Sequence, residues 1–247
     1  MVEETLFSSL RSPLSAAQGI FIFLPEEPSF DQVASALGLS LSLKKAGKTL
    51  SVNCPTEMKV EYSDLVGINQ IQTKLAGRNL VISFEYLEDA IEKVSYNIEE
   101  NKFNLVVQPK VGSPPLSSDR VAYSYSGGQA DLIFTVGVQD LNELGDLYRR
   151  SKPFFESQKI IDVDLSPRTK RYAQKELILA VSSFSELVAR LLSRLGLPVD
   201  GDIANNLYLG IEETTEGFSS ASVGAGTFEA AAFCLRAAGK VDFAPLG

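Results

Sequence analysis

The chain has 247 residues, of which 45% are hydrophobic and 22% are charged, a composition that excludes a disordered or fibrous protein. Its net charge of −8 argues against nonspecific binding of duplex DNA, because contacts to phosphates need a positive surface. The complete absence of histidine excludes catalytic triads, imidazole general bases and nearly every zinc site built on nitrogen ligands.

The first third of the chain alternates strands with helices. A short helix is expected over residues 4–17, and an amphipathic helix begins at Asp31 and ends before Gly47, which suits its C-terminal cap. Strands are predicted over residues 19–24, 49–54 and 79–84. Strands separated by helical patterns predict βαβ units and a mainly parallel sheet.

The periodicity changes in the middle of the chain. KVSYNIEENKFNLVVQPK alternates apolar and polar residues around EEN, a pattern typical of an antiparallel hairpin. VAYSYS (121–126) predicts a further strand of the same piece. We therefore expect a hairpin insertion at about residues 93–126 within a single domain that covers residues 1–247.

The alternation of strands and helices then resumes. Strands are predicted over 130–138 and 159–165, and helices over 140–150, 184–195, 201–213 and 227–238. The expected fold class is thus α/β, with a mainly parallel sheet, helices on both faces and an inserted antiparallel hairpin.

Localisation and cysteine chemistry follow from simple counts. No apolar run reaches the roughly 18 to 20 residues that a membrane span needs, so we expect no membrane association. MVEETLFSSL is acidic where a signal peptide would be basic, which favours a cytoplasmic protein. Cys54 and Cys234 lack metal-like spacing, so we expect them to be buried apolar residues.

The start of the second predicted helix resembles a known motif. PEEPSFDQVAS, followed by ALGLSLSLKKAGK, resembles the first motif of the DHH phosphoesterase superfamily, H-x-N-P-D-G-D-A-x-G-S followed by A-L-x-L-x-x-x-L-K-K-x-G-K. The most similar branch is that of oligoribonucleases and phosphoadenosine-phosphate phosphatases. Pro28, Asp31 and Ser35 match the motif. Pro25 and Ser29 stand where the family has a histidine and an aspartate that bind metal.

Two further motifs show the same combination of matching framework and missing ligands. TVGVQDLNELG resembles the second motif, but Gly137 replaces its metal-binding aspartate. IIDVDLSP resembles the third motif, which gives the family its Asp-His-His name. Asp164 matches its aspartate, whereas Leu165 and Ser166 replace both histidines.

The resemblance continues to the end of the chain. VSSFSELVARLL resembles the S-S-T-A-E-L-V helix of the family, and IANNLYLGIEETTEGF resembles A-x-x-L-x-x-G-I-x-x-D-T-G-x-F, with Thr214 in place of the aspartate. It therefore covers about residues 18–240 and implies the core domain of the family. The C-terminal substrate-binding domain of the family is expected to be absent.

The favoured interpretation is a relative that has lost catalytic metal binding and hydrolysis, and that binds a nucleotide, a short oligonucleotide or a protein. The basic loop SPRTKR follows the strand that carries Asp164, and its cations could hold a phosphate that metals hold in the family. A solvated loop is the simpler reading of this charge run. The predicted ligand-binding residues are Ser29, Asp31, Ser35, Arg168, Lys170 and Arg171.

The alternative is a divergent phosphodiesterase or phosphatase that uses Mg²⁺ or Mn²⁺, since carboxylates are the ligands that hard ions prefer. Its metal ligands would be Asp31, Asp162, Asp164, Glu212 and Glu213. Against it, acids at helix starts are often caps, as expected for Asp140, and Glu212 and Glu213 suit a helix surface.

The expected absence of the second domain also bears on partners. The apolar face that this domain would cover must be polar, or must be buried by another molecule. We therefore expect a homodimer or a complex with a partner protein.

Overall fold

The computed structural model describes residues 2–75, 79–85, 88–114, 116–117, 121–126, 130–167 and 171–239. The chain divides into two compact units. Unit 1 comprises Met1–Ala76 with Gly128–Gly247, and unit 2 comprises Gly77–Gly127.

Unit 1 is built on a five-stranded sheet in the order β2-β1-β7-β8-β9. Its strands are β1 (Gly19–Phe23), β2 (Thr49–Asn53), β7 (Leu132–Val136), β8 (Lys159–Asp164) and β9 (Lys175–Ile178). Every neighbouring pair in this sheet is parallel, which confirms the predicted fold class. The short edge strand β9 was not predicted.

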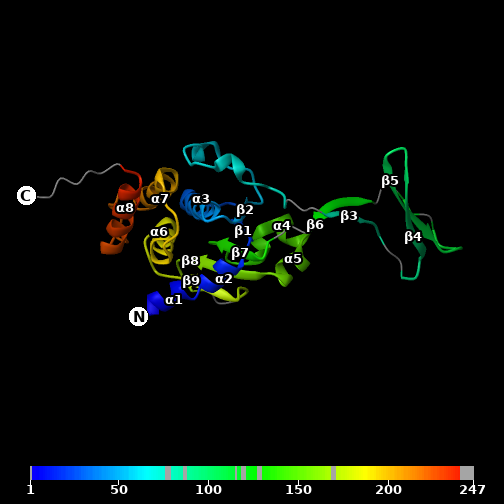
Figure 1. The fold of residues 1–247 in the computed structure, drawn as a ribbon, viewed down its shortest axis with the longest axis horizontal. Coiled ribbons are helices and arrows are strands. Elements are labelled where there is room, and N and C mark those ends of the chain that lie inside the picture. Colours follow the sequence, from blue (N-terminus) through cyan, green and yellow to red (C-terminus); the bar gives the residue numbers. More distant parts are fainter. Residues whose placement is uncertain are drawn as a thin grey trace, which may run out of the picture. The chain divides into compact units, whose positions relative to one another are not determined.

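Helices cover both faces of this sheet, and each face has its own apolar core (Figure 1). The larger core lies under α1 (Val2–Ser8), α2 (Arg11–Ala16), α3 (Phe30–Lys45), α6 (Phe184–Leu195), α7 (Gly201–Thr214) and α8 (Ala225–Ala237). The smaller one lies under α4 (Gly145–Arg149) and α5 (Lys152–Ser157). Single-turn 3₁₀ helices occur at Val60–Tyr62, Ile68–Gln70 and Leu141–Leu144.

The alternation of side chains along the strands explains the two cores. In β7, Ile133 faces the smaller core while Phe134 and Val136 face the larger one. In β8, Ile161 and Val163 face the larger core, and Ile160 faces the smaller one. Strands that are buried on both faces read as continuous apolar runs, which made β1, β7 and β8 recognisable in the sequence.

The order of the strands creates one switch point. The chain runs from β1 through α3 to β2 on one side, whereas β7 lies on the other side of β1. In open α/β sheets, ligands bind outside the carboxyl ends of the strands at such a point. Here, this position is formed by the turn from β1 into α3 and by Gly137, which follows β7.

Unit 2 contains two antiparallel strand pairs. β3 (Asn79–Ser83) pairs with β6 (Ala122–Ser126), and β4 (Ile91–Glu99) pairs with β5 (Lys102–Pro109). The predicted hairpin is thus present as β4 and β5. The assignment of residues 79–84 to the parallel sheet was wrong, because β3 pairs with β6. Residues 121–126 lie in the same unit as the hairpin, as predicted, but they pair with β3 and form a separate sheet. An apolar strand sequence does not reveal its partner.

Other differences concern helix ends. The segment predicted as a helix over 140–150 is a 3₁₀ turn followed by α4, with a break at Gly145, whose φ is 52°. The helix expected over 4–17 is divided into α1 and α2. Cys54 and Cys234 are both buried and free, as predicted. Within the described ranges, no helix is long and apolar enough to cross a membrane.

Candidate functional site

The switch point begins with a capped helix. Ser29 is the N-cap of α3, where the backbone N–H of Gln32 donates to Ser29 Oγ at 3.2 Å. In return, the backbone N–H of Ser29 donates to Gln32 Oε1 at 2.8 Å. This reciprocal pair is a capping box, which satisfies two backbone donors at the helix start. Both side chains are therefore used to begin α3.

Gln32 also connects α3 to the neighbouring strand. Its Nε2 donates to the carbonyl oxygen of Gly137 at 3.2 Å. Gly137 has a φ of +62°, and a Cβ atom there would lie 2.0 Å from Gln32 Nε2 and 2.9 Å from Phe184 Cζ. The space in which a side chain at position 137 would begin is therefore filled. We call the contact between Ser29, Gln32 and Gly137 the Gln32 bridge.

Asp31 lies next to this bridge and caps a different helix. Its side chain is buried, and it accepts hydrogen bonds from the backbone N–H groups of Phe184 at 2.6 Å and Ser185 at 2.8 Å. These are the first two residues of α6, whose N–H groups have no partner within the helix. The negative carboxylate also suits the positive end of the helix dipole. Asp31 therefore fixes α3 to the start of α6.

Burial has a cost for this carboxylate. Desolvation raises the pKa of Asp31 from 3.8 to about 6, although the hydrogen bonds from Ser185 and Phe184 favour the charged form. The negative charge of Glu213 on α7 adds to the rise. Gly210 on α7 allows Asp31 and Ser185 to pack closely against that helix, since a Cβ atom at position 210 would lie 2.9 Å from Asp31 Oδ1 and 2.1 Å from Ser185 Oγ.

The other candidate aspartates lie over the opposite face of the sheet. Asp162 and Asp164 alternate with Ile161 and Val163 along β8, so they share the side of α4 and α5. Asp162 is buried and accepts hydrogen bonds from Thr135 Oγ1 and from the Tyr172 hydroxyl, both at 2.9 Å.

Asp164 organises the turn that follows β8. Its Oδ1 accepts hydrogen bonds from the backbone N–H groups of Leu165 at 2.6 Å and Ser166 at 3.2 Å. Its Oδ2 accepts one from Gln139 Nε2 at 3.1 Å, which links the ends of β7 and β8. Asp164, which matches the aspartate of the Asp-His-His motif, thus binds the backbone of Leu165 and Ser166, the residues at the two histidine positions.

The remaining predicted residues are distributed over several environments. Ser35 is buried in α3, and its hydroxyl donates to the carbonyl oxygen of Gln32 at 2.9 Å. Glu212 is half-buried and Glu213 is exposed on α7. Arg171 is exposed and forms an ion pair with Glu176 at 3.3 Å. Arg168 and Lys170 lie outside the described residues.

These donors do not match the set that a pair of metal ions needs. Two adjacent divalent ions repel each other and require a dense shell of anionic ligands. Asp31 lies on one side of the sheet with its oxygens on the N–H groups of α6, while Asp162 and Asp164 lie on the other side. Among the described residues, no three or more Asp, Glu or Cys side chains gather in a way that could hold a metal ion.

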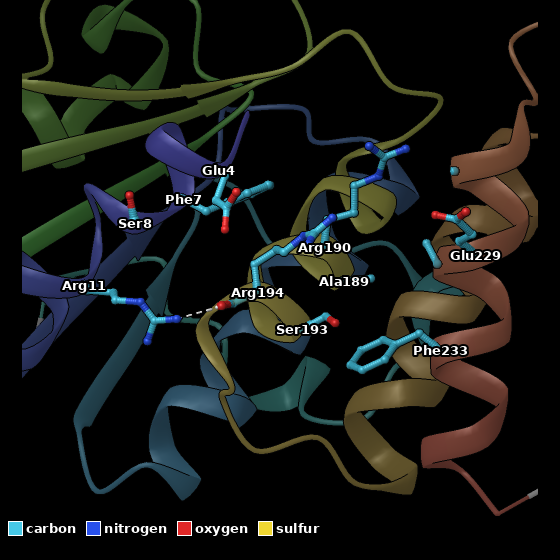
Figure 2. A pocket seen from close by; sticks show the side chains of 12 residues that line it. Glu4, Phe7, Ser8, Arg11, Ala189, Arg190, Ser193, Arg194, Glu229 and Phe233 are labelled. Atoms are coloured by element: carbon cyan, nitrogen blue, oxygen red, sulfur yellow. Dashed lines mark hydrogen bonds between the residues drawn. The ribbon is translucent and has the colours of Figure 1, made fainter. Parts of the chain in front are cut away.

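A separate cavity of about 490 Å³ lies between α1, α2, α6 and α8 (Figure 2). Figure 2 shows Arg190 and Arg194 along α6, with Glu229 and Phe233 opposite them on α8. On α6 the cavity begins at Ala189, about 6 Å along the helix from Ser185, whose backbone N–H donates to Asp31. Because helices from the two ends of the chain form it, no local sequence pattern indicated it.

Three arginines and two glutamates line this cavity. Arg190 binds Glu3 at 3.1 Å and Glu186 at 2.6 Å, and Gly226 leaves room for its guanidinium against α8. Arg11 donates to the carbonyl oxygen of Arg194 at 2.8 Å. The lining also includes the carboxylates of Glu4 and Glu229.

Comparison with known proteins places the fold. No protein-family model matches the chain, and no curated protein matches it either. Among solved structures, an exopolyphosphatase-related protein from Bacteroides fragilis matches with a TM-score of 0.66 and 17% identity, over 97% of this chain and 58% of that one. A Methanococcus jannaschii protein assigned as a family II inorganic pyrophosphatase matches with a TM-score of 0.50 and 15% identity, over 89% of this chain and 56% of that one.

These matches show that this chain shares the fold of both solved structures. This chain spans somewhat more than half of the length of each. At these identities the similarity establishes the fold alone, and the activities of the two proteins do not transfer to this chain.

Proposed function

We propose that this chain is a DHH phosphoesterase-like domain that no longer binds catalytic metal ions and that acts as a binding module. The observation that carries the proposal is the Gln32 bridge at the switch point. There, Ser29 and Gly137 stand at two metal-ligand positions of the resembled motifs. Both are used to seat the Gln32 side chain against the end of β7.

The proposal is supported by the chemistry that hydrolysis requires. Phosphoester hydrolysis of this type needs a metal-bound hydroxide as the nucleophile, and the metal lowers the pKa of that water. The chain has no histidine, and Asp31 and Asp164 each serve a helix start or a turn. The residues at the switch point thus favour structural roles over metal ligation.

The ligand we propose is a nucleotide or short oligonucleotide whose terminal phosphate meets the basic loop that follows β8. This loop carries Arg168, Lys170 and Arg171 on a chain whose net charge is −8. Arg171 is exposed, so its guanidinium is accessible for a bidentate contact to phosphate. The second candidate ligand is a protein that binds at the same edge of the sheet.

The test combines turnover and metal binding in the full chain. We expect no hydrolysis of bis-p-nitrophenyl phosphate or of dinucleotides with Mg²⁺ or Mn²⁺, and no change in melting temperature with either metal. A saturated site would stabilise the chain by about 3 kcal/mol at a metal concentration 100 times its Kd. Binding of a terminally phosphorylated dinucleotide should weaken in Arg171→Ala but not in Arg149→Ala, an exposed arginine on α4.

Manganese-dependent turnover would overturn the proposal if it disappears in both Asp31→Ala and Asp164→Ala. Asp140→Ala is the matched control, because Asp140 caps the Leu141–Leu144 turn at the same edge of the sheet. Turnover that survives all three substitutions would indicate a contaminating hydrolase rather than this chain.

A further inference from the structure

The β4–β5 hairpin of unit 2 has one face made of exposed apolar side chains. Tyr96, Ile98 and Phe103 are 68%, 69% and 65% exposed. Val94 and Leu105 are 57% and 45% exposed. Figure 1 shows the two strands as a twisted ribbon. Exposed apolar patches of this kind on monomers are often functional.

The strand register places these side chains together. Tyr96 is opposite Leu105 and Ile98 is opposite Phe103, while Val94 is opposite Val107. Directly opposite residues of an antiparallel pair point to the same side, and residues two apart along a strand share that side. The stacked rings of Tyr96 and Phe103, with centroids 5.2 Å apart, lie within the face.

The opposite side of the hairpin is mostly polar. It carries Lys93, Ser95, Asn97, Glu99, Lys102, Asn104, Val106 and Gln108. One apolar and one polar side is the pattern of an antiparallel sheet that covers a core on one face. No residue of the hairpin belongs to either buried apolar cluster of the described chain.

A hairpin of this kind needs something to cover its apolar side. Two antiparallel strands alone are at best marginally stable in water. The exposed apolar side chains of the face present on the order of 600 Å² of surface, at the upper end of what a monomer shows. What covers the face must therefore be apolar, and roughly as large and flat as the face itself.

We propose that this face packs against the same face of a second copy of the chain, forming a twofold-symmetric dimer. Each copy would contribute about 600 Å², so the interface would bury about 1,200 Å² in total, which reaches the range of specific interfaces. A twofold contact uses the same patch on both copies, so the apolar face would meet an equal apolar face. The result is two hairpins stacked face to face, as in a small β-sandwich.

Charge also favours a second copy at this place. The hairpin together with Lys110, which follows it, contains three glutamates and three lysines, so residues 91–110 have a net charge of zero on a chain of −8. Two copies of an acidic chain repel each other, and the repulsion is smallest where their neutral parts meet. The same argument predicts that added salt strengthens the dimer, since salt screens the repulsion between the rest of the two chains.

The first test measures self-association of the full chain by sedimentation equilibrium. We expect a species of twice the 26.8 kDa chain mass. Ile98→Asp should raise the dimer dissociation constant by about 100-fold or more, because a carboxylate would be buried without a partner. Asn97→Asp adds the same charge to the neighbouring residue on the polar side and should leave the constant within about threefold.

A monomeric wild-type chain at 100 μM, or a dimer that Ile98→Asp leaves intact, would overturn the proposal. A photo-crosslinking residue in place of Tyr96 gives a readout that does not depend on the folding of a charged variant. In a mixture of isotopically light and heavy chains, we expect mixed-isotope crosslinks between two copies of residues 91–109. Crosslinks found only within one chain would show that unit 1 covers the face, and the proposal would be wrong.

Discussion

The raised pKa of Asp31 predicts a specific pH dependence of stability, which replacement by asparagine should remove. The carboxyl group is buried and has a pKa of about 6 in the folded chain, against 3.8 for an unperturbed aspartate. An asparagine side chain at this position would have a similar shape but would not titrate. The comparison of Asp31→Asn with the wild type therefore isolates the titration of one group.

The sign follows from proton linkage. Because the folded chain holds this proton more tightly than the unfolded chain, the free energy of unfolding falls as the pH rises from 3.8 to about 6, and then levels off. A shift of about two units corresponds to about 3 kcal/mol, of which about 2 kcal/mol is lost between pH 4 and pH 7. The wild-type stability relative to Asp31→Asn should fall by this amount over that range.

Urea unfolding followed by far-UV circular dichroism, at several pH values from 4 to 7.5, measures this difference. Asp200→Asn is the matched control, because the hydrogen bond from Lys45 to Asp200 holds the pKa of that N-cap carboxyl below its usual value. Its contribution is present above the unfolded pKa and is lost as the pH falls, so the slope has the opposite sign. A pH-independent difference for Asp31→Asn would refute the burial of a charged Asp31.

Two further predictions concern the packing around the switch point. Gly210→Ala should lower the free energy of unfolding by about 2 kcal/mol, because its Cβ would lie 2.1 Å from Ser185 Oγ. Gly201→Ala is the control: the space around this position is open, so the free energy of unfolding should be unchanged or slightly higher. Ser29→Ala should lower the free energy of unfolding by about 1 kcal/mol, because the α3 cap is lost, whereas Ser29→Thr should keep most of the wild-type stability. Equal stability of the wild type and both variants in urea unfolding would contradict the capping role.

Local signals in the sequence were sufficient for most helices and central strands. The helix predicted over 184–195 has the same bounds in the structure, since Ser183 caps its start and Gly196 ends it with a φ of 67°. β9 was missed because KELI is a four-residue edge strand with two charged residues, which no apolar run distinguishes from a loop. The partner of β3 was misjudged because pairing is a tertiary property that the strand sequence does not carry.

The candidate site was only partly accessible to sequence reasoning. The motif comparison selected Ser29 and Gly137, but not Gln32, which joins them. A signal for Gln32 was present, because serine followed three residues later by glutamine is a capping-box pattern. No sequence signal indicated that Asp31 caps α6, whose first residue is 153 positions away in the chain.

Ser29, Gln32 and Gly137 depend on one another, which bears on whether a metal ligand could be introduced at position 137. An aspartate introduced at position 137 would meet the Gln32 amide, and Ser29 holds that amide in place through the capping box. Moving the Gln32 side chain would break its hydrogen bond from the Ser29 backbone N–H, which is one half of the capping box of α3, next to the residue that positions α6. Ser29 and Gly137 thus both hold the Gln32 side chain. Because Asp31 and Asp164 lie over opposite faces of the sheet, a metal site that used both would require substitutions on both faces.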